Sequence, residues 1–464
     1  MTRLLVALLA LSSAANAAPD SHTRALAAGY KAAFLCSGIF TAGQTEVQVT
    51  ADDLTGIYPE YADIVPTLPA TIDQAAKTVA VTFDPALPPR IAAWRPRLGC
   101  TQLPIGAPAS NVADLPRLDS ISAPDLDAQA WPTGDMAAVR PLKRRVQAKL
   151  DAAVASAFDH ASFGAGTETT AVVVIANGMI VAERYRGGYG PHVPQRTWSV
   201  AKSITGTLIG RAAAMGLLDV TAAAPVPDWQ TVGDPRAAIT MTQLMHMASG
   251  LWSNGPGSRT DGVYLGGASV DETAPAMPLE AAPGTRFNYA NNDTLLAARA
   301  LRYAIGGGRK ALEFPFTQLF WRIGMTRTTP ETDWRGNYVL SSQVWTTARD
   351  LGRLGLLYLA DGKWGTEQLL PPGWPEFVAT PAPAQPARAA AGTRGYGAFF
   401  WTFGGVAGLP ADSYAMLGTR GQSVIIIPSR GVVIVRRGFD AWGKPPFEDA
   451  RFAKAVLDVL SAER

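Results

Sequence analysis

The 464-residue chain is poor in the residues that metal-dependent and histidine-dependent hydrolases use. It holds four histidines, His22, His160, His192 and His246, and none belongs to a His-Glu-x-x-His zinc pair. It has no Gly-x-Ser-x-Gly elbow and no glycine-rich phosphate loop. We therefore expect neither a metal nor a cofactor, and a Ser-His-Asp triad is disfavoured. His246 is interpreted as a structural histidine.

Charge is also scarce. Charged residues make up 17% of the chain against 47% hydrophobic ones, and the net charge is +3. This composition is typical of a globular protein with a large core. The one basic cluster, Lys143, Arg144, Arg145 and Lys149, falls in a helical pattern. It is interpreted as a solvated face, so no nucleic-acid partner is expected.

Long apolar runs are absent beyond the start of the chain. Residues 1–18 contain Arg3, an apolar run from Leu4 to Leu11 and a small-residue end. That order is typical of a secretory signal peptide, with cleavage after Ala17 or Ala18, and the run is too short to span a bilayer. We expect an exported protein, periplasmic or secreted, with no stable membrane anchor after cleavage. The sequence leaves its oligomeric state open.

The only two cysteines, Cys36 and Cys100, both lie within residues 19–103. In an oxidising compartment, two thiols and no others suggest one disulfide; two buried free thiols are the alternative. The same residues carry a helical pattern from Ala25 to Leu35 and are predicted to form an accessory region tied by that disulfide. The sequence leaves the role of this region open, and a partner-binding module is one alternative. Residues 104–141, dense in proline and aspartate, are predicted to be a linker.

The remaining residues, 142–464, are predicted to form one α+β domain. Asn177-Gly178 separates two β-rich runs, 171–176 and 179–185, which is a strong hairpin signal. Further strands are expected at 397–403, 423–427 and 432–437, and helices at 142–158 and 447–461. An antiparallel sheet built from both ends of this segment, with terminal helices on one face and a helical middle on the other, accounts for the order.

Between these ends, the stretch from Arg196 to Ala214 carries a serine three residues before a lysine. Apolar residues recur there every four positions, at Val200, Ile204, Leu208 and Ala212. This spacing predicts a helix that opens at Ser199 and buries one face, with Lys202 one turn away. A buried lysine with a lowered pKa can take the proton of a serine and so create a nucleophile. On an exposed helix, the same pair would be solvated and without chemistry.

Four further segments follow in order: Ile239 to Leu251, Pro283 to Asn291, Ile323 to Met325, and Thr347 to Gly355. Together with Ser-x-x-Lys they resemble the penicillin-recognising serine hydrolases, which include class C β-lactamases, D-alanyl-D-alanine carboxypeptidases, and related esterases and 6-aminohexanoate-dimer hydrolases. The Thr-Ala-Arg-Asp and Gly-Met segments look most like the last group. The likeness covers roughly residues 142–464 and implies a β-lactamase/transpeptidase-like fold.

The resemblance also implies roles for the only Tyr-x-Asn in the chain, Tyr289 to Asn291. Tyr289 would lie beside Ser199 and Lys202 and exchange protons with the nucleophile and the leaving group. Asn291 would hold the substrate carbonyl or the lysine. The alternatives are a buried core phenol for Tyr289 and a turn or capping residue for Asn291.

The third motif of the family, Lys-Thr-Gly or a variant, is where the chain departs from the pattern. The corresponding residues 416–422 read Met-Leu-Gly-Thr-Arg-Gly-Gln and contain no lysine. Related hydrolases with a Gly-Gly-Gln ending also lack it. We expect Gly421 and Gln422 to bind substrate, and the oxyanion hole to combine the N–H of Ser199 with one N–H from this strand. Arg420 either binds a substrate carboxylate or is an exposed edge arginine.

These features predict an exported serine hydrolase that cleaves an amide or ester bond of a small or short peptide-like substrate through an acyl-enzyme on Ser199. Short amides or esters, including 6-aminohexanoate-like oligomers, rank above β-lactams and peptidoglycan peptides. The alternative is a low-turnover or non-catalytic protein that binds penicillin or peptidoglycan, which the altered third motif motivates. The glycine- and proline-rich residues 252–283 are expected to form a wall of the site.

Overall fold

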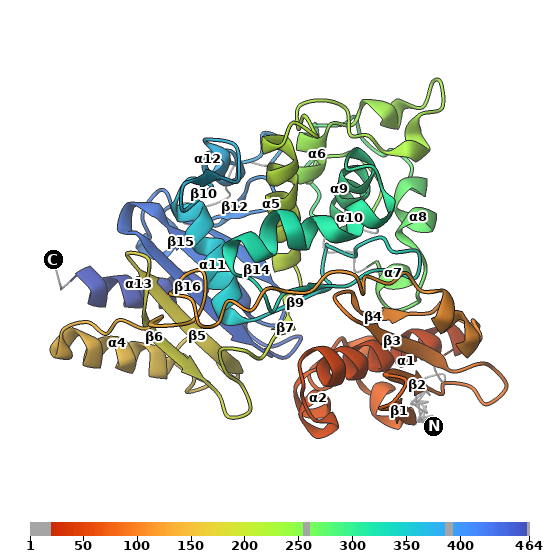
Figure 1. Cartoon of the computed structure of the whole chain (residues 1–464), viewed down its shortest axis with the longest axis horizontal. Helices are drawn as coiled ribbons and strands as arrows, with labels where there is room; N and C mark the ends of the chain where they lie inside the picture. Colours follow the sequence, from red (N-terminus) through yellow and green to blue (C-terminus); the bar gives the residue numbers. More distant parts are fainter. Residues whose placement is uncertain (1–19, 254–259, 386–392, 462–464) are drawn as a thin grey trace, which may run out of the picture.

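The computed structural model describes residues 20–253, 260–385 and 393–461 (Figure 1). The predicted signal peptide, residues 1–18, lies outside the described residues. Among the helices that are described, none combines the length and the apolar character that crossing a membrane requires.

A seven-stranded antiparallel sheet is formed from both ends of the segment that follows residue 142, as predicted. Its strand order is β12-β13-β14-β15-β16-β5-β6. The strands are β5 (Thr169–Ala176), β6 (Met179–Tyr185), β12 (Gly395–Tyr396), β13 (Trp401–Thr402), β14 (Tyr414–Gly418), β15 (Gln422–Ile427) and β16 (Val432–Gly438). Asn177 and Gly178 turn between β5 and β6 with φ of 49° and 83°, which is the left-handed backbone that Asn-Gly favours.

The two faces of this sheet are covered by different helices. Helices α4 (Arg144–Ser156) and α13 (Asp449–Ser461) pack on one face, where Leu150 and Val456 join Val172 of β5 in one apolar cluster. Helix α11 (Ala348–Leu359) packs on the other face, against Val173 and its neighbours. Because successive residues of a strand point to opposite faces, β5 is buried on both sides and reads as a continuous apolar run. The α+β prediction is confirmed.

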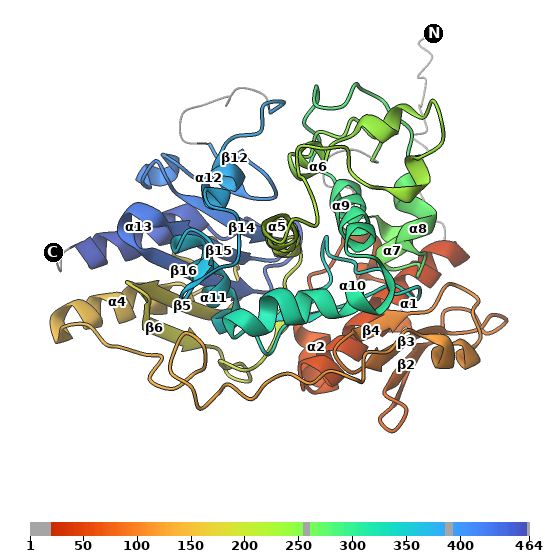
Figure 2. The same ribbon diagram turned by 45° about the horizontal axis from the view of Figure 1, so that its top comes forward.

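The helical middle surrounds one central helix, α5 (Val200–Ala214), which Figure 2 shows nearly end-on between the sheet and α9. The other helices are α6 (Met241–Met245), α7 (Asp261–Tyr264), α8 (Val270–Thr273), α9 (Asn291–Ala304), α10 (Gly308–Phe314) and α12 (Trp374–Ala379). Short strands β7 (Gln195–Arg196), β9 (Val344–Thr346) and β8 (Thr329–Pro330) form a small sheet, and β10 (Lys363–Trp364) pairs with β11 (Glu367–Gln368).

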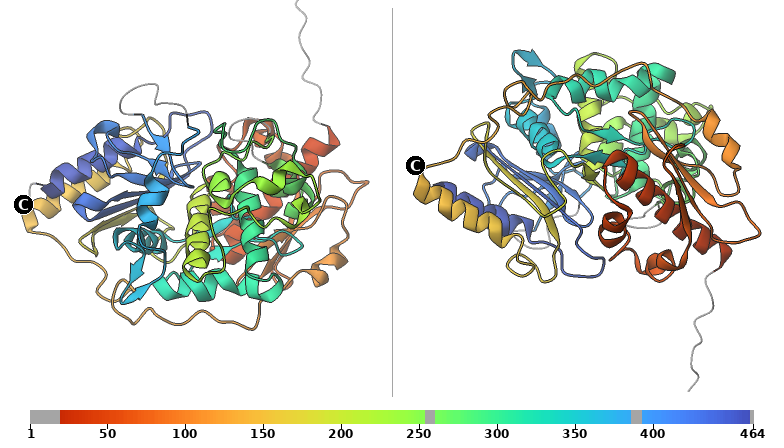
Figure 3. Two further views of the ribbon diagram at one scale, coloured as in Figure 1. Left: turned by 90° about the horizontal axis from the view of Figure 1, so that it is seen from above. Right: turned by 60° about the horizontal axis from the view of Figure 1, so that its bottom comes forward.

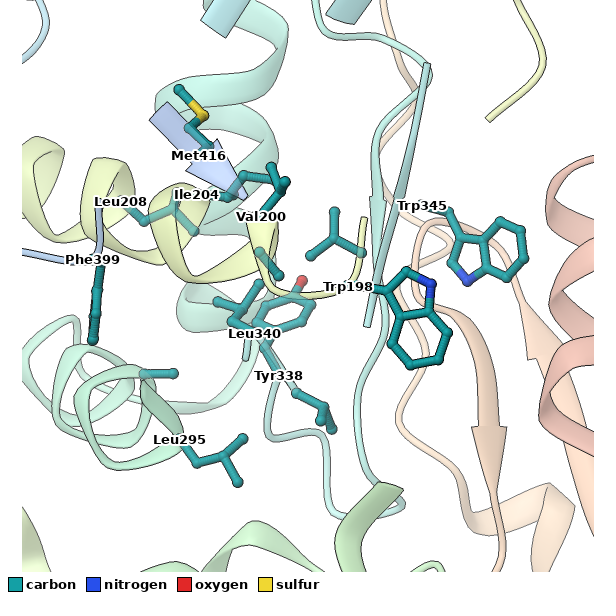
Figure 4. Close-up of a cluster of buried hydrophobic side chains, with 14 of the residues drawn as sticks. Trp198, Val200, Ile204, Leu208, Leu295, Tyr338, Leu340, Trp345, Phe399 and Met416 are labelled. Carbon is teal, nitrogen blue, oxygen red and sulfur yellow. The ribbon is translucent and has the colours of Figure 1, made fainter. Parts of the chain in front are cut away.

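The prediction that α5 buries a single face is wrong. Its residues are buried without interruption from Val200 to Ala212. Figure 4 shows Val200, Ile204 and Leu208 in a cluster of buried apolar side chains that also includes Phe399, Met416, Leu295 and Leu340. Glycines permit this packing, since a Cβ at Gly210 would lie 2.6 Å from the indole of Trp374. Small residues thus let neighbours approach the helix all round.

The N-terminal region forms its own layer beside the helical middle (Figure 3). It consists of α1 (Ser21–Cys36), α2 (Glu46–Asp52), α3 (Pro59–Ala62) and an antiparallel sheet of β1 (Ala70–Asp73), β2 (Thr78–Val81), β3 (Arg90–Arg95) and β4 (Gly99–Gln102). Its apolar residues belong to the same cluster as those of α5 and α9. Buried polar bonds also cross the boundary: Arg90 donates to the carbonyls of Leu265 and Gly266, and Ser37 donates to Glu331.

The extended segment 104–141 connects this region to α4 along the outside of the molecule (Figure 3). Trp131 donates its indole N–H to the carbonyl of Gly178 at 2.8 Å, and Asp135 accepts from Arg353 of α11 at 2.6 Å. These contacts fasten the segment to both the hairpin and the helix behind the sheet.

Cys36 and Cys100 form the predicted disulfide, with a Cα–Cα distance of 6.1 Å across 64 residues of sequence. Removing it with a reductant or by Cys36→Ala/Cys100→Ala is expected to lower the free energy of unfolding by about 4 kcal/mol, because the unfolded chain gains loop entropy. Denaturant titration with and without reductant measures this difference. The double variant serves as its own control, since reductant should leave its midpoint unchanged. Equal midpoints for the oxidised and reduced wild-type protein would contradict the expectation.

Candidate active site

The turn into α5 presents Ser199 to a cavity of about 790 Å³. Trp198, immediately before the serine, has a φ of +50°, a left-handed backbone that is unfavourable for a bulky residue. Ser199 occupies the N-cap position of α5 but makes no side-chain capping bond. Its hydroxyl is therefore free for other partners, and its N–H has no acceptor within the described residues.

Lys202 is buried, with 1% of its surface exposed, and makes three hydrogen bonds. Its Nζ lies 3.0 Å from Ser199 Oγ, 2.7 Å from Asn291 Oδ1 and 2.9 Å from the carbonyl oxygen of Ser341. Burial lowers the pKa of Lys202 to about 7. Two of the three partners can only accept, so a neutral Lys202 uses both its protons on Asn291 and Ser341. The lone pair of the amine then faces the hydroxyl of Ser199.

Tyr289 approaches the same hydroxyl from the other side. Burial raises the pKa of Tyr289 to about 12, although the nearby side chain of Ser199 favours the phenolate. Its ring centroid lies 5.1 Å from Lys202 Nζ. At neutral pH, the phenol is thus protonated and next to both Ser199 and Lys202.

A buried carboxyl group of α9 holds the segment 239–251 against this helix. Asn291 is the first residue of α9, and Asp293, two residues later, accepts from the hydroxyl and the N–H of Ser249 at 2.7 and 3.3 Å. Burial raises the pKa of Asp293 to about 7. This connection joins the segment 239–251 to the helix that carries Asn291, two stretches that the sequence places apart.

The third motif lies at the turn between β14 and β15. Gly418, which was not among the predicted site residues, comes closest to the serine: a Cβ there would lie 2.4 Å from the carbonyl oxygen of Thr197 and 3.1 Å from the N of Ser199. Gly421 and Gln422 line the cavity. The amide of Gln422 is engaged by the protein, donating to the carbonyls of Arg420 and Gly438 and accepting from Arg437.

Both interpretations of Arg420 need correction. It is 7% exposed, so it is not an exposed edge arginine. Its guanidinium donates to the carbonyls of Asp53, Thr55, Phe439 and Asp440, so a substrate carboxylate would have to displace these bonds. The sequence could not reveal this role because two of the acceptors lie more than 360 residues away along the chain.

The rest of the cavity wall was not predicted. Apolar side chains come from Trp401, Leu417, Trp442 and Phe447, and cations from Arg394 and Lys444. Two carboxyl groups also line the cavity: Asp440, which is ion-paired with Arg436, and Asp449, whose pKa is raised by burial and on which Arg394 acts electrostatically. The residues 260–283, expected to form a wall, contribute none of the lining residues; instead Tyr264 is hydrogen-bonded to Ser341 Oγ. Residues 254–259 of the same stretch lie outside the described part of the chain.

Within residues 20–253, 260–385 and 393–461, one group of side chains has the ligand atoms for a metal ion: Asp127, Asp135 and His192. Arginines already neutralise its carboxylates, since Arg327 binds Asp127 and Arg353 binds Asp135. None of the three lines the cavity at Ser199. They act as an ion-pair network that fastens the segment 104–141. His246 packs against Phe377, and burial lowers the pKa of its imidazole.

Comparison with known proteins identifies the family of the chain. Residues 146–436 match the family model Beta-lactamase. Solved structures of similar fold include a Bacillus anthracis protein with a provisional 6-aminohexanoate-dimer hydrolase name (23% identity, 67% of this chain and 81% of that chain, TM-score 0.54). Another is a penicillin-binding protein homolog from Caulobacter crescentus (15% identity, 69% and 98%, TM-score 0.54). A comparison with curated protein sequences finds no match.

The fold and the matched residues define a penicillin-recognising serine hydrolase, a class that acts on amide or ester bonds. The chain belongs to the Beta-lactamase family.

The pKa of Lys202 predicts the pH dependence of Ser199 acylation. On the prediction that the neutral amine acts as the base, the rate is expected to rise with pH through about 7, while Tyr289 stays protonated. Asn291→Asp places a carboxylate beside the amine and favours its charged form. It is therefore expected to raise the pH at which the labelling rate increases (the rising limb of the pH profile) by roughly 1 to 3 pH units. The rate of fluorophosphonate labelling across pH 5–10 measures the limb.

Asn291→Ala is the matched control, because it removes the acceptor without adding charge. Its limb is expected to stay at or below that of the wild type. A limb that moves equally in both variants, or a wild-type rate that is flat between pH 6 and 8, would contradict the assignment of Lys202 as the base.

Proposed function

We propose that the protein hydrolyses short amides or esters through an acyl-enzyme on Ser199. The observation that carries the proposal is the partner set of Lys202, in which only Ser199 can donate a proton to the neutral amine. Lys202 takes the hydroxyl proton as Ser199 Oγ attacks the substrate carbonyl. A base with a pKa near 7 is suited to this transfer at neutral pH.

The oxyanion of the tetrahedral intermediate would be held by backbone N–H groups. The N–H of Ser199 is one donor, and the end of β14 at Gly418, which lies against it, supplies the second. The tight approach of this strand explains why a glycine stands at the position. No side-chain cation is needed for the step, which accommodates the missing third-motif lysine.

Proton return to the leaving group completes acylation. Tyr289 lines the cavity with Ser199 and its ring lies next to Lys202, so in this proposal Lys202 and Tyr289 together pass the proton to the departing amine or alcohol. Water then attacks the acyl carbonyl, and the same pair takes its proton and returns it to Ser199 Oγ. Asn291 holds Lys202 in place throughout.

The cavity favours a substrate with an apolar body and a negative end. Its walls of Trp401, Leu417 and Trp442 suit an alkyl chain. Arg394 and Lys444 also line it, whereas of its two carboxyl groups Asp440 is ion-paired with Arg436 and burial raises the pKa of Asp449. Short linear amides such as 6-aminohexanoate oligomers combine both properties. We rank them, with related esters, above β-lactams and peptidoglycan peptides.

The purified mature protein is expected to be labelled by a fluorophosphonate at Ser199 and to turn over p-nitrophenyl esters or 6-aminohexanoate dimer. Ser199→Ala is expected to lose both properties, and Lys202→Met is expected to slow acylation by at least about 100-fold because it removes the base without removing bulk. Intact-mass spectrometry measures the labelling, and steady-state assays measure the turnover. Labelling without turnover would favour the penicillin- or peptidoglycan-binding alternative, and absence of both would overturn the proposal.

Arg394 provides a test of substrate preference. Arg394→Gln is expected to raise KM for 6-aminohexanoate dimer by roughly 3-fold to 10-fold, because it removes a charge that the substrate carboxylate would face at a partly exposed position. A neutral p-nitrophenyl ester of similar length is the control, and its KM should be unchanged. Equal changes in KM for both substrates would mean that Arg394 does not bind the substrate carboxylate.

A further inference from the structure

The N-terminal region lies outside the matched family residues 146–436, and nothing in the comparisons assigns it a role. Its residues 53–58, Asp-Leu-Thr-Gly-Ile-Tyr, nevertheless contact the turn before Ser199 and two parts of the cavity wall. We propose that this 53–58 segment is part of the active site and that Tyr58 is a positioning residue for Ser199. The inference rests on the proposed function, since it concerns the same nucleophile.

The first contact is with the turn that carries the nucleophile. The ring of Trp198 lies 6.2 Å from the ring of Tyr58, edge to face, and 5.7 Å from that of Phe34 in α1. The guanidinium of Arg196 lies next to two of these rings, 4.5 Å from the Trp198 centroid and 4.7 Å from that of Phe34. Figure 4 shows the Trp198 ring turned away from the apolar side chains of α5, toward the side of the N-terminal ribbon.

This packing matters because Trp198 adopts a φ of +50°. A non-glycine residue in this region costs of order 1 to 3 kcal/mol and persists only when its surroundings hold it there. The Trp198 ring is 5% exposed, and two of its aromatic neighbours come from the N-terminal region. That region therefore helps to hold the backbone that orients the N–H and the hydroxyl of Ser199.

The second contact is with the third motif. Arg420 donates to the carbonyl oxygens of Asp53 at 3.2 Å and Thr55 at 2.7 Å. Its own φ is +62°, so this turn is also held in an unfavourable conformation. Because Arg420 directly precedes Gly421 and follows the strand that ends at Gly418, the 53–58 segment fixes the turn that faces the nucleophile.

The third contact is with the loop that closes the cavity. Trp442 donates its N–H to the carbonyl of Gly56 at 2.8 Å, and its ring lies 4.8 Å from that of Tyr58. A Cβ at Gly56, whose φ is +64°, would lie 2.8 Å from Cβ of Ala441. Trp442 and Ala441 both line the cavity, so Tyr58 touches the nucleophile turn on one side and the substrate wall on the other.

The test compares Tyr58→Ala, Tyr58→Phe and Phe83→Ala in the full-length protein. Phe83 is the matched control: it is a buried aromatic of the same region, but its carbonyl accepts from Arg24 near the start of α1, away from Phe34. Tyr58→Ala is expected to lower kcat and the fluorophosphonate labelling rate by about 10-fold to 100-fold, as small misplacement of a nucleophile does. Tyr58→Phe keeps the ring and is expected to stay within about twofold of the wild type.

Phe83→Ala is expected to lower the melting temperature to a similar extent as Tyr58→Ala while leaving the labelling rate within about twofold of the wild type. If Tyr58→Ala does not fold, Phe34→Leu tests the same contact with Trp198 from α1 and is expected to slow labelling at least about 3-fold. Labelling that is unchanged in the folded Tyr58 or Phe34 variants, or slowed equally by Phe83→Ala, overturns the inference. A wild-type protein that is not labelled at Ser199 would instead overturn the proposed function.

Discussion

The amine of Lys202 is removed from water, and the structure around Ser199 depends on how its charge is handled. A buried ammonium without partners is costly, so the group must lose its proton, gain acceptors, or both. Here its pKa falls to about 7, and Asn291 and Ser341 supply oxygens for its two remaining protons. The arrangement requires α5 to be buried all round, which its glycines allow. It also keeps negative charge out of direct contact with the amine, since a carboxylate there would favour the ammonium form.

Buried charged groups with neutral hydrogen-bond partners also hold the loops around the cavity. Buried arginines fix them by binding neutral carbonyl oxygens. Arg420 binds the 53–58 segment and the residues after β16, and Arg437 donates to the carbonyls of Gln195, Arg196 and Thr346. Burial lowers the pKa of Arg437 to about 9, which reflects the cost of removing its charge from water, and the hydrogen bonds to these carbonyls offset part of that cost. Turns that carry unfavourable φ values at Trp198 and Arg420 can persist because rings and guanidinium groups hold them from outside.

Local signals in the sequence predicted local structure well. Asn177-Gly178 specified a hairpin because few other residues accept two successive left-handed conformations, and the apolar runs on either side supplied its strands. The four-residue spacing after Ser199 predicted α5 and placed Lys202 one turn from the serine, at 3.0 Å. The residues that line the cavity, by contrast, could not be predicted from local signals. Trp442, Lys444 and Arg394 carry no pattern that links them to Ser199, and residues 252–283, which looked like a wall, contribute none of the lining residues that the structure describes.

By itself, the sequence determined the class of the protein, the α+β order of its elements, and Ser199, Lys202, Tyr289 and Asn291 as candidates, because each depends on spacing within a short stretch or on an ordered series of motifs. It also indicated the one disulfide, because the chain has only two cysteines. Only the tertiary structure decided that Arg420 binds main-chain carbonyls, that Gly418 lies against the serine, and that the N-terminal region reaches the nucleophile through Tyr58. These are contacts between residues far apart in the chain. They are set by how layers pack and by which buried polar groups need partners, and neither leaves a periodic trace in the sequence.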